Sequence, residues 1–198
     1  MGLAEVQSAL ARLYTDVSLR ERFLADPGVV GQELGLSDEE IAQITHLSAP
    51  QLRFFAASLV SKRRQEVEKL LPRTRRALGR QFGTCFARYA VAPIPDGIHK
   101  HWKEALAFAA FLEQSGGQPP WVGDVLRYER AWLEASSPGR LWLVRRFGHP
   151  VGQPVPQVTD DVSLQALPPR LTIGLWFRLG RHGTLRHVLL SPPFGGRR

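Results

Sequence analysis

The sequence predicts a mainly helical α+β protein, in which a bundle of about seven helices is followed by a small three-stranded antiparallel sheet. Three observations predict this fold class. Over about the first two thirds of the chain, apolar residues recur every three or four positions, the spacing of an amphipathic helix. Beyond residue 137 the composition changes to runs of β-branched and aromatic residues. Two of these runs are joined by a four-residue segment with glycine at both ends, which is typical of a hairpin turn.

The N-terminal residues 1–47 are predicted to form a module of short helices. Residues 3–14 place a stripe of leucine and valine on one helical face. Ser37 followed by Glu40 is a capping box, in which each side chain bonds the backbone N–H of the other residue. The next helix should be the longest one. It should end or kink just before Pro72, because proline cannot donate a backbone hydrogen bond.

We predict that the chain divides into a helical domain, residues 1–135, and a small β-containing domain, residues 137–198. The helical domain comprises the N-terminal module and a helical core of residues 48–135. Within that core, residues 72–129 hold three or four amphipathic helices. The β-prone segments are residues 140–147, 171–179 and 184–190.

The net charge of +8 is unevenly distributed along the chain. Residues 1–50 carry three arginines against eight acidic residues, whereas residues 51–90 carry ten basic residues against two acidic ones. Residues 136–198 carry nine arginines against two aspartates. Basic blocks of this size attract nucleic acid, acidic peptides or an acidic protein surface, so charge alone does not choose among these partners.

Several classes of protein lack support in the sequence. No run of 18 apolar residues predicts a membrane-spanning helix, and the N-terminus lacks the pattern of a signal peptide. The single cysteine, Cys85, precludes an internal disulfide and fits a reducing cytoplasm; its aromatic neighbours predict a buried thiol. We therefore expect a cytoplasmic protein.

Motifs of catalysis or metal binding are also missing from the sequence. It has no glycine-rich phosphate loop, no GxSxG and no CxxC. His99 and His101 form an HxH pair, but no carboxylate or cysteine stands at ligand spacing, so we interpret them as surface histidines. We expect this chain to have no catalytic, cofactor-binding or metal-binding residues, and not to be an enzyme.

A first resemblance concerns the N-terminal module. A helix leads into an RxxFLxDP pattern at residues 20–27, then a Gly-Leu-Ser step at residues 35–37 and an acidic capped helix from Asp38. This order resembles small helical modules in the alpha subunit of LigAB-type ring-opening dioxygenases and in nitrile-hydratase-like leader peptides. The resemblance carries no catalytic residue over to this chain.

A second resemblance lies in the helical core, between positions 71 and 129. The residues that carry it are Leu71-Pro72, Leu78-Gly79, Phe82, Phe86, Tyr89, Phe111-Leu112, and Asp124 followed by Glu129. In this order and spacing they resemble the accessory subunits, named for a DNA-binding domain, that partner multinuclear non-haem iron oxygenases, such as that of methanobactin biosynthesis. The chain departs from that family at Leu71, where phenylalanine is usual, and over residues 1–50.

The second resemblance implies a non-catalytic accessory subunit. Such subunits bind an iron oxygenase and help to recruit a ribosomally made precursor peptide for modification; the iron is expected in the partner enzyme. A basic helical face can steer an acidic leader peptide, and a sheet edge can pair with an extended segment. The residues that we predict to contact the partner or peptide are Arg73, Arg75, Arg76, Arg80, Asp124, Glu129, and, in strand 171–179, Thr172, Leu175 and Phe177.

Other interpretations of the same residues stay open. The arginines could form an ordinary solvated helix face, and the two carboxylates could meet a helix dipole, solvent or an arginine. The alternative function is a DNA-binding transcriptional regulator that uses the basic block of residues 51–90. Residues 37–71 are then the candidate helix-turn-helix, although its second helix is long and apolar on one side. A free-standing enzyme is the third interpretation.

Overall fold

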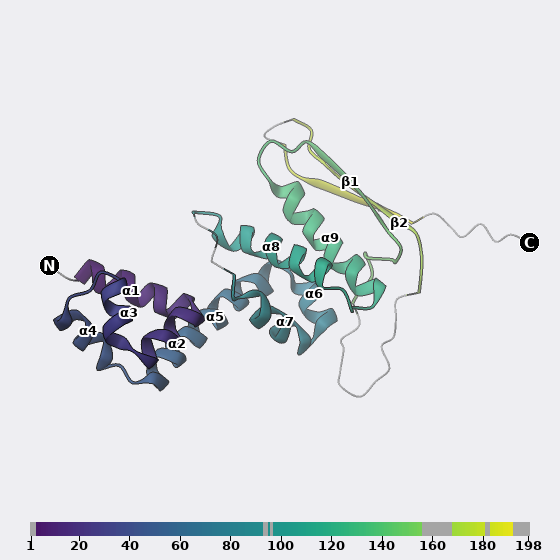
Figure 1. The fold of residues 1–198 in the computed structure, drawn as a ribbon. Coiled ribbons are helices and arrows are strands. Elements are labelled where there is room, and N and C mark those ends of the chain that lie inside the picture. The colour runs from purple at the N-terminus through teal and green to yellow at the C-terminus, as the bar shows by residue number, and fades with distance from the viewer. Residues whose placement is uncertain (1–2, 93–94, 96, 156–167, 181–182, 192–198) are drawn as a thin grey trace, which may run out of the picture. The chain divides into compact units, whose positions relative to one another are not determined.

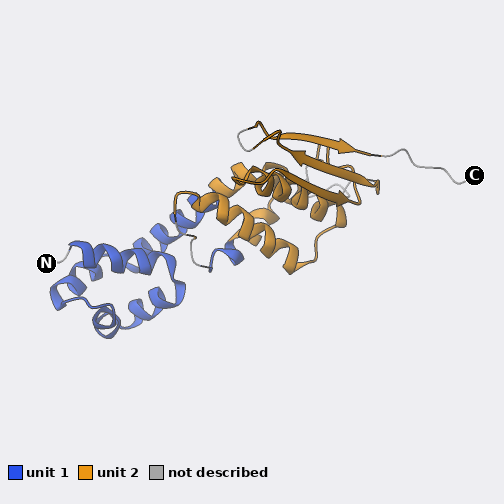
Figure 2. Cartoon of the chain, turned by 90° about the horizontal axis from the view of Figure 1, so that it is seen from above, with its two compact units in different colours: residues 1–65, 87–94 blue, residues 66–86, 95–198 orange. Residues whose placement is uncertain are grey.

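The computed structural model describes residues 3–92, 95, 97–155, 168–180 and 183–191. The chain divides into two compact units (Figure 2). Unit 1 comprises residues 1–65 and 87–94, and unit 2 comprises residues 66–86 and 95–198. The predicted boundaries at residues 47 and 135 remain predictions.

Within the described residues, nine helices precede three strands (Figure 1), which confirms the predicted mainly helical α+β class. The elements are α1 (Leu3–Thr15), α2 (Val17–Ala25), α3 (Pro27–Glu33), α4 (Asp38–Thr45), α5 (Ala49–Leu70), α6 (Pro72–Leu78), α7 (Gln81–Tyr89), α8 (Lys100–Ser115), α9 (Pro120–Ser136), β1 (Trp142–Phe147), β2 (Thr172–Phe177) and β3 (Arg186–Leu190). As predicted, the longest helix ends just before Pro72. The count exceeds the predicted seven partly because Gly79, with φ of 52°, separates α6 from α7. None of the described helices is both long and apolar enough to cross a membrane.

Unit 1 has a hydrophobic core of its own, to which α1 to α4 contribute. Its buried residues are Ala9, Leu13, Leu19, Phe23, Val30, Leu36, Ile41 and Ile44. Helices α3 and α4 approach closely at Gly31, where an added Cβ would lie 2.4 Å from Cγ1 of Ile41. Glycine at this position therefore sets the distance between the two helices.

Side-chain caps begin the short helices of unit 1. Asp16 accepts the backbone N–H of Leu19 at 2.9 Å and so caps α2. The predicted capping box of α4 is confirmed: the Ser37 N–H donates to Glu40 Oε2 at 2.9 Å, and the Glu40 N–H donates to Ser37 Oγ at 3.4 Å. These local bonds explain why helices this short form here.

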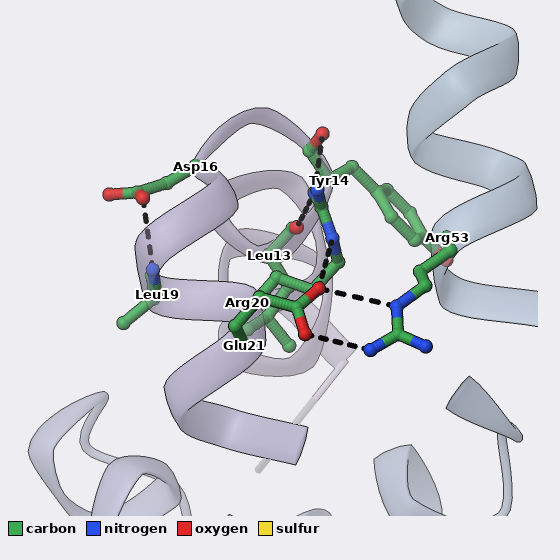
Figure 3. A network of polar contacts seen from close by, with 7 residues as sticks. All are labelled: Leu13, Tyr14, Asp16, Leu19, Arg20, Glu21 and Arg53. Atoms are coloured by element: carbon green, nitrogen blue, oxygen red, sulfur yellow. Dashed lines mark hydrogen bonds and ion pairs between the residues drawn. The ribbon is translucent and has the colours of Figure 1, made fainter. Parts of the chain in front are cut away.

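Two arginines of unit 1 bind the carbonyl groups that helices leave unpaired at their C-terminal ends. Arg20, which is buried, donates to the carbonyl of Leu13 at 3.0 Å (Figure 3). Arg63, also buried, donates to the carbonyls of Ala90 and Ala92, just beyond α7. A cation is favoured at a helix C-terminus because the last carbonyls carry partial negative charge.

A surface ion pair joins two helices of unit 1. Glu21 on α2 accepts two hydrogen bonds from Arg53 on α5, at 3.2 and 2.7 Å (Figure 3). The neighbouring rings of Tyr14 and Phe55 join α1 to the same helix, with centroids 5.9 Å apart. These contacts hold the first turns of α5 against α1 and α2.

In unit 2, one side of the sheet packs on α9 (Figure 1). Tyr128 and Trp132 of α9 meet Trp176 of β2 at centroid distances of 5.7 and 6.2 Å. Arg178, just after β2, donates to the carbonyls of Ala135 and the following residue at the end of α9, both at 3.3 Å. The sheet therefore holds α9 through an aromatic core and through a helix cap.

The sheet has the strand order β1-β2-β3, with both pairs antiparallel, as predicted. The register places Leu143 opposite Trp176, which lies opposite His187. Because side chains alternate along a strand, these three point to one face and their neighbours to the other. In the predicted hairpin turn, residues 181–182 lie outside the described residues.

Candidate functional site

Arg73 and Arg75, which were predicted to contact a partner, are engaged within unit 2. The Arg73 guanidinium donates to the carbonyl of Gln153 and lies 5.2 Å from the centre of the Tyr128 ring. Arg75 forms an ion pair with Glu68 at 3.1 Å. Both contacts tie α6 to other elements of unit 2, so these side chains have a structural role.

Arg76 is the predicted arginine that is best placed to meet another molecule. It is exposed and, with Arg73, borders an open hollow of about 420 Å³. The other residues that line this hollow are Pro72, Gly152, Gln153, Pro154 and Val155. Arg80 is also exposed but does not line it. Among the predicted arginines, Arg76 is therefore both exposed and next to a hollow.

Glu129, predicted as a partner contact, caps a helix from inside the fold. Its carboxylate accepts the backbone N–H of Arg73 at 2.7 Å, and the backbone N–H and hydroxyl of Thr74 at 2.8 and 2.6 Å. Helix α6 begins with Leu71 in the capping position, and leucine cannot accept these bonds, so Glu129 replaces the missing cap. Burial raises the pKa of Glu129 above its ordinary value, and these hydrogen bonds offset part of that effect.

Asp124, the second predicted carboxylate, is also buried inside unit 2. It accepts from the Gly148 N–H at 3.0 Å, from His149 Nδ1 at 2.6 Å and from Arg127 Nη2 at 2.5 Å. Asp124 thereby ties α9 to the turn that follows β1. The structure places both predicted carboxylates within the fold rather than on a partner-facing surface.

The topology corrects one prediction about strand 171–179. Because β2 is the central strand, its backbone groups pair with β1 on one side and β3 on the other. A peptide therefore cannot add along β2, which was predicted to receive it. Thr172 is buried as well, with its hydroxyl 3.1 Å from the Ser191 hydroxyl. Leu175 and Phe177 lie on the opposite face of the sheet from Thr172 and are only half-buried.

The inner face of the sheet, which packs on α9, is an aromatic cluster. Trp176 is fully buried there and contacts Tyr128, Trp132 and the ring of His187. His187 also lies 3.4 Å from the Tyr128 hydroxyl, through Nε2. Burial in this cluster lowers the pKa of His187 below its ordinary value of 6.5, because the charged ring loses hydration.

The outer face of the same sheet is mostly apolar. Its residues alternate with the inner ones and are Trp142, Val144, Arg146, Ile173, Leu175, Phe177, Arg186, Val188 and Leu190. In Figure 2 the strands lie at the top of unit 2, with its helices below them. Trp142 is 70% exposed and Leu190 is 56% exposed. An antiparallel sheet that faces water usually has polar residues on that side, so this outer sheet face is a candidate docking surface.

The backbone edges available for pairing lie on β1 and β3. Within the described sheet, each of these two strands pairs on one side alone. Strand β1 carries Arg145, which donates to Glu134 of α9 at 2.7 Å, and then Arg146. Strand β3 carries one arginine, Arg186, and then Val188 and Leu190 on its outer side. Charged residues discourage pairing at an edge, so β3 is the more receptive of the two.

Sequence reasoning placed two residues of the outer sheet face, Leu175 and Phe177, but missed the face as a whole. The available signal was the run Leu-Thr-Ile-Gly-Leu-Trp-Phe at residues 171–177, which is apolar at almost every position. Such a run is typical of a strand whose two faces are both covered. The tie of Asp124 to Arg127 had a local signal, the i,i+3 spacing on one helix, whereas its tie to His149 had none, since His149 lies 25 residues away.

Other predicted side chains can now be placed. Among the described residues, no group of three or more His, Cys, Asp or Glu side chains is arranged to hold a metal ion. Cys85 is half-buried, not fully buried as predicted, because it lies at the edge of the helical face formed by the buried Phe82, Phe86 and Tyr89.

Residues 47–114, about one third of the chain, match the model of the family described as SCO6045-like, C-terminal domain. The match begins after α4 and ends within α8, so it includes α5, α6 and α7. No curated protein matches this chain.

Proposed function

We propose that this protein is a non-catalytic accessory subunit that binds an extended peptide and a partner protein through its sheet. The observation that carries this proposal is the outer sheet face, which is mostly apolar and partly exposed and is bounded by two strands that, among the described residues, each pair on one side alone. An extended peptide that pairs with β3 would extend the sheet and place every second side chain on the apolar outer side. Arg186, on β3 itself, favours acidic residues in that peptide.

The finer assignment rests on the resemblance of residues 71–129 to accessory subunits of iron oxygenases. On this proposal the partner is a multinuclear non-haem iron oxygenase, which holds the iron, and the peptide is its ribosomally made precursor. The exposed Arg76 and Arg80 would steer an acidic leader segment. The subunit itself would supply binding surface and no reacting group.

DNA binding, the alternative function, has weaker support. Several cations of the basic block of residues 51–90 are engaged within their own unit. Arg53 pairs with Glu21, and Lys69 pairs with Glu66 at 2.6 Å. Arg63 is buried against backbone carbonyls. Cations held in this way contribute less to the release of counterions from a phosphate backbone.

Co-expression with a multinuclear non-haem iron oxygenase encoded beside this chain, followed by affinity purification, tests the proposal. We expect a stable complex in which the iron is found with the oxygenase. Val188→Lys on the outer sheet face should reduce recovery of the complex or of its bound precursor peptide. Val29→Lys, which changes an exposed valine in unit 1, is the matched control and should have no effect. No association with the oxygenase would contradict the proposal.

A salt titration separates the two functions. If the protein binds DNA, affinity for duplexes of any sequence should fall steeply with log salt concentration. Pairing with a precursor peptide should instead depend on the peptide sequence and much less on salt, because it buries apolar side chains. Tight, sequence-independent duplex binding that Val188→Lys leaves unchanged would favour the DNA-binding alternative.

A further inference from the structure

A second hollow of unit 2 lies on a different part of the molecule from the outer sheet face. It has a volume of about 560 Å³, within the range of small-molecule sites. The end of α8, the first turns of α9 and the turn after β1 border it. Pro119 and Pro120 give it an apolar wall, and Asp124, Arg127 and His149 form a polar side.

The polar side has one hydrogen-bond donor, Arg127, and one acceptor, His149, and Asp124 holds both in place from behind. Buried Asp124 accepts Arg127 on Oδ1 and His149 Nδ1 on Oδ2. An arginine has five N–H donors, and this contact uses one nitrogen of Arg127, whose side chain is 53% exposed. The His149 ring donates its Nδ1–H to Asp124, so Nε2 of the neutral ring is an acceptor that is left for a further bond. Groups held by a buried carboxylate are pre-organised for a ligand.

The charge of the hollow does not oppose an acidic ligand. Asp124 is balanced by Arg127 at 2.5 Å. Glu113, the other acidic lining residue, forms an ion pair with Arg130 at 2.5 Å. Each lining carboxylate thus pairs with a cation, although Arg130 also pairs with Glu134 at 2.9 Å. The further donors of Arg127 are suited to the planar oxygens of a carboxylate.

Gly123 supplies an independent observation. It lies within α9 and lines the hollow, and an added Cβ would meet no atom within 4 Å. Glycine within a helix is unfavourable relative to alanine, and packing does not require it at this position. The missing side chain instead leaves the hollow open.

We propose that this hollow binds the carboxylate of a small acid with a short apolar body, either a free acylated amino acid or the C-terminal residue of a peptide. Arg127 binds the carboxylate oxygens, and Nε2 of His149 accepts the N–H of the neighbouring amide. The apolar stem lies against Pro119 and Pro120, and Gly123 leaves room for it. This site is separate from the outer sheet face, and its occupancy does not depend on the proposed function.

Titration of the full-length protein followed by NMR or calorimetry tests this site. The probes are N-acetyl-leucine, N-acetyl-leucine amide, and the peptide acetyl-Gly-Gly-Gly-Leu with a free C-terminus. We expect the free acid to bind with a Kd of about 1 mM and the amide at least about tenfold more weakly. Tighter binding of the peptide than of N-acetyl-leucine would identify a chain terminus as the ligand; the reverse order would identify a free acid.

Two variants complete the test. Gly123→Leu fills the hollow without touching the Asp124 contacts, and should abolish binding while the thermal unfolding temperature stays the same or rises. Arg127→Gln should weaken binding about tenfold, whereas Arg88→Gln, an exposed arginine of α7, is the matched control. If Arg127→Gln fails to fold, Gly123→Leu decides alone. Equal binding of acid and amide, undiminished binding by Gly123→Leu, or no binding of either free carboxylate would overturn the proposal.

Discussion

The two faces of the small sheet are built from the same three strands and are both apolar, yet they have opposite environments. On the inner face, Trp176 is fully buried against Tyr128 and Trp132 of α9. On the outer sheet face, Trp142 and Leu190 are exposed to 70% and 56%. Apolar content alone therefore does not distinguish a core face from a candidate docking face.

The two faces differ in what packs against them. The inner face packs on a helix that has further ties of its own, through Glu129 to α6 and through Asp124 to the turn after β1. The apolar residues of the outer sheet face remain more exposed, so they stabilise the fold less than those of the inner face do. The contrast indicates that the inner face serves stability, whereas the outer face is an exposed apolar surface and so a candidate docking surface.

Truncating one tryptophan on each face should give the largest contrast. Trp176→Ala should lower the free energy of unfolding by about 3–5 kcal/mol, because it leaves a cavity in the aromatic cluster. Trp142→Ala changes the same residue type on the outer face and should cost less than about 1 kcal/mol. Urea unfolding at neutral pH measures both values. Similar losses would contradict the comparison.

Removing the support beneath the inner face should have the next largest effect. Glu129→Ala leaves two backbone N–H groups and the Thr74 hydroxyl without their acceptor, and should cost about 2–3 kcal/mol. Glu129→Gln keeps one acceptor oxygen and should cost clearly less. Thermal or urea unfolding gives both values; equal losses for alanine and glutamine would show that the carboxyl oxygens do not cap α6.

The pH dependence of stability should report on the inner face through His187. Its pKa is lowered in the folded protein, so below its ordinary value of 6.5 the unfolded chain binds more protons than the folded one. The stability that comes from burying His187 as an uncharged ring is fully present above pH 6.5 and is lost as the pH falls further. His187→Phe keeps an aromatic ring and removes the titration. The difference in unfolding free energy between pH 7.5 and 5.5 should therefore be smaller in the variant, and an unchanged difference would contradict this assignment.

The smallest change in stability is expected on the outer sheet face. Val188→Thr keeps a β-branched side chain in β3 and replaces an exposed methyl group with a hydroxyl. It should alter the free energy of unfolding by no more than about 0.5 kcal/mol. Urea unfolding measures this change, with Trp176→Ala as the reference for the inner face. A loss that approaches the one caused by Trp176→Ala would show that this face belongs to the core.

Local patterns predicted much of the fold. The capping box at Ser37 and Glu40, the break before Pro72 and the hairpin after residue 171 each depend on residues close together in sequence. Strand order is different, because which strand lies in the centre depends on pairing between β1 and β2, which are distant in the sequence. The sequence therefore indicated three strands without showing that β2 has no open edge.

The candidate site was less predictable, for a related reason. Asp124 and Glu129 stand out in the sequence, but their burial depends on partners 24 to 56 residues away. The arginines of α6 form a basic cluster in sequence, whereas Arg73 and Arg75 are engaged by contacts that no periodicity shows. Charge patterns locate the titratable groups and leave open which of them the fold itself uses.

The arginines that hold helix ends have a consequence for acid tolerance. Arg20, Arg63 and Arg178 bind the ends of α1, α7 and α9 with guanidinium groups, which stay protonated at any pH at which the protein is folded. Acidification therefore leaves these three attachments intact. It acts on the imidazole of His187, whose pKa is lowered by burial, so loosening on acidification is expected around His187 on the inner face of the sheet while the arginine-held helix ends persist.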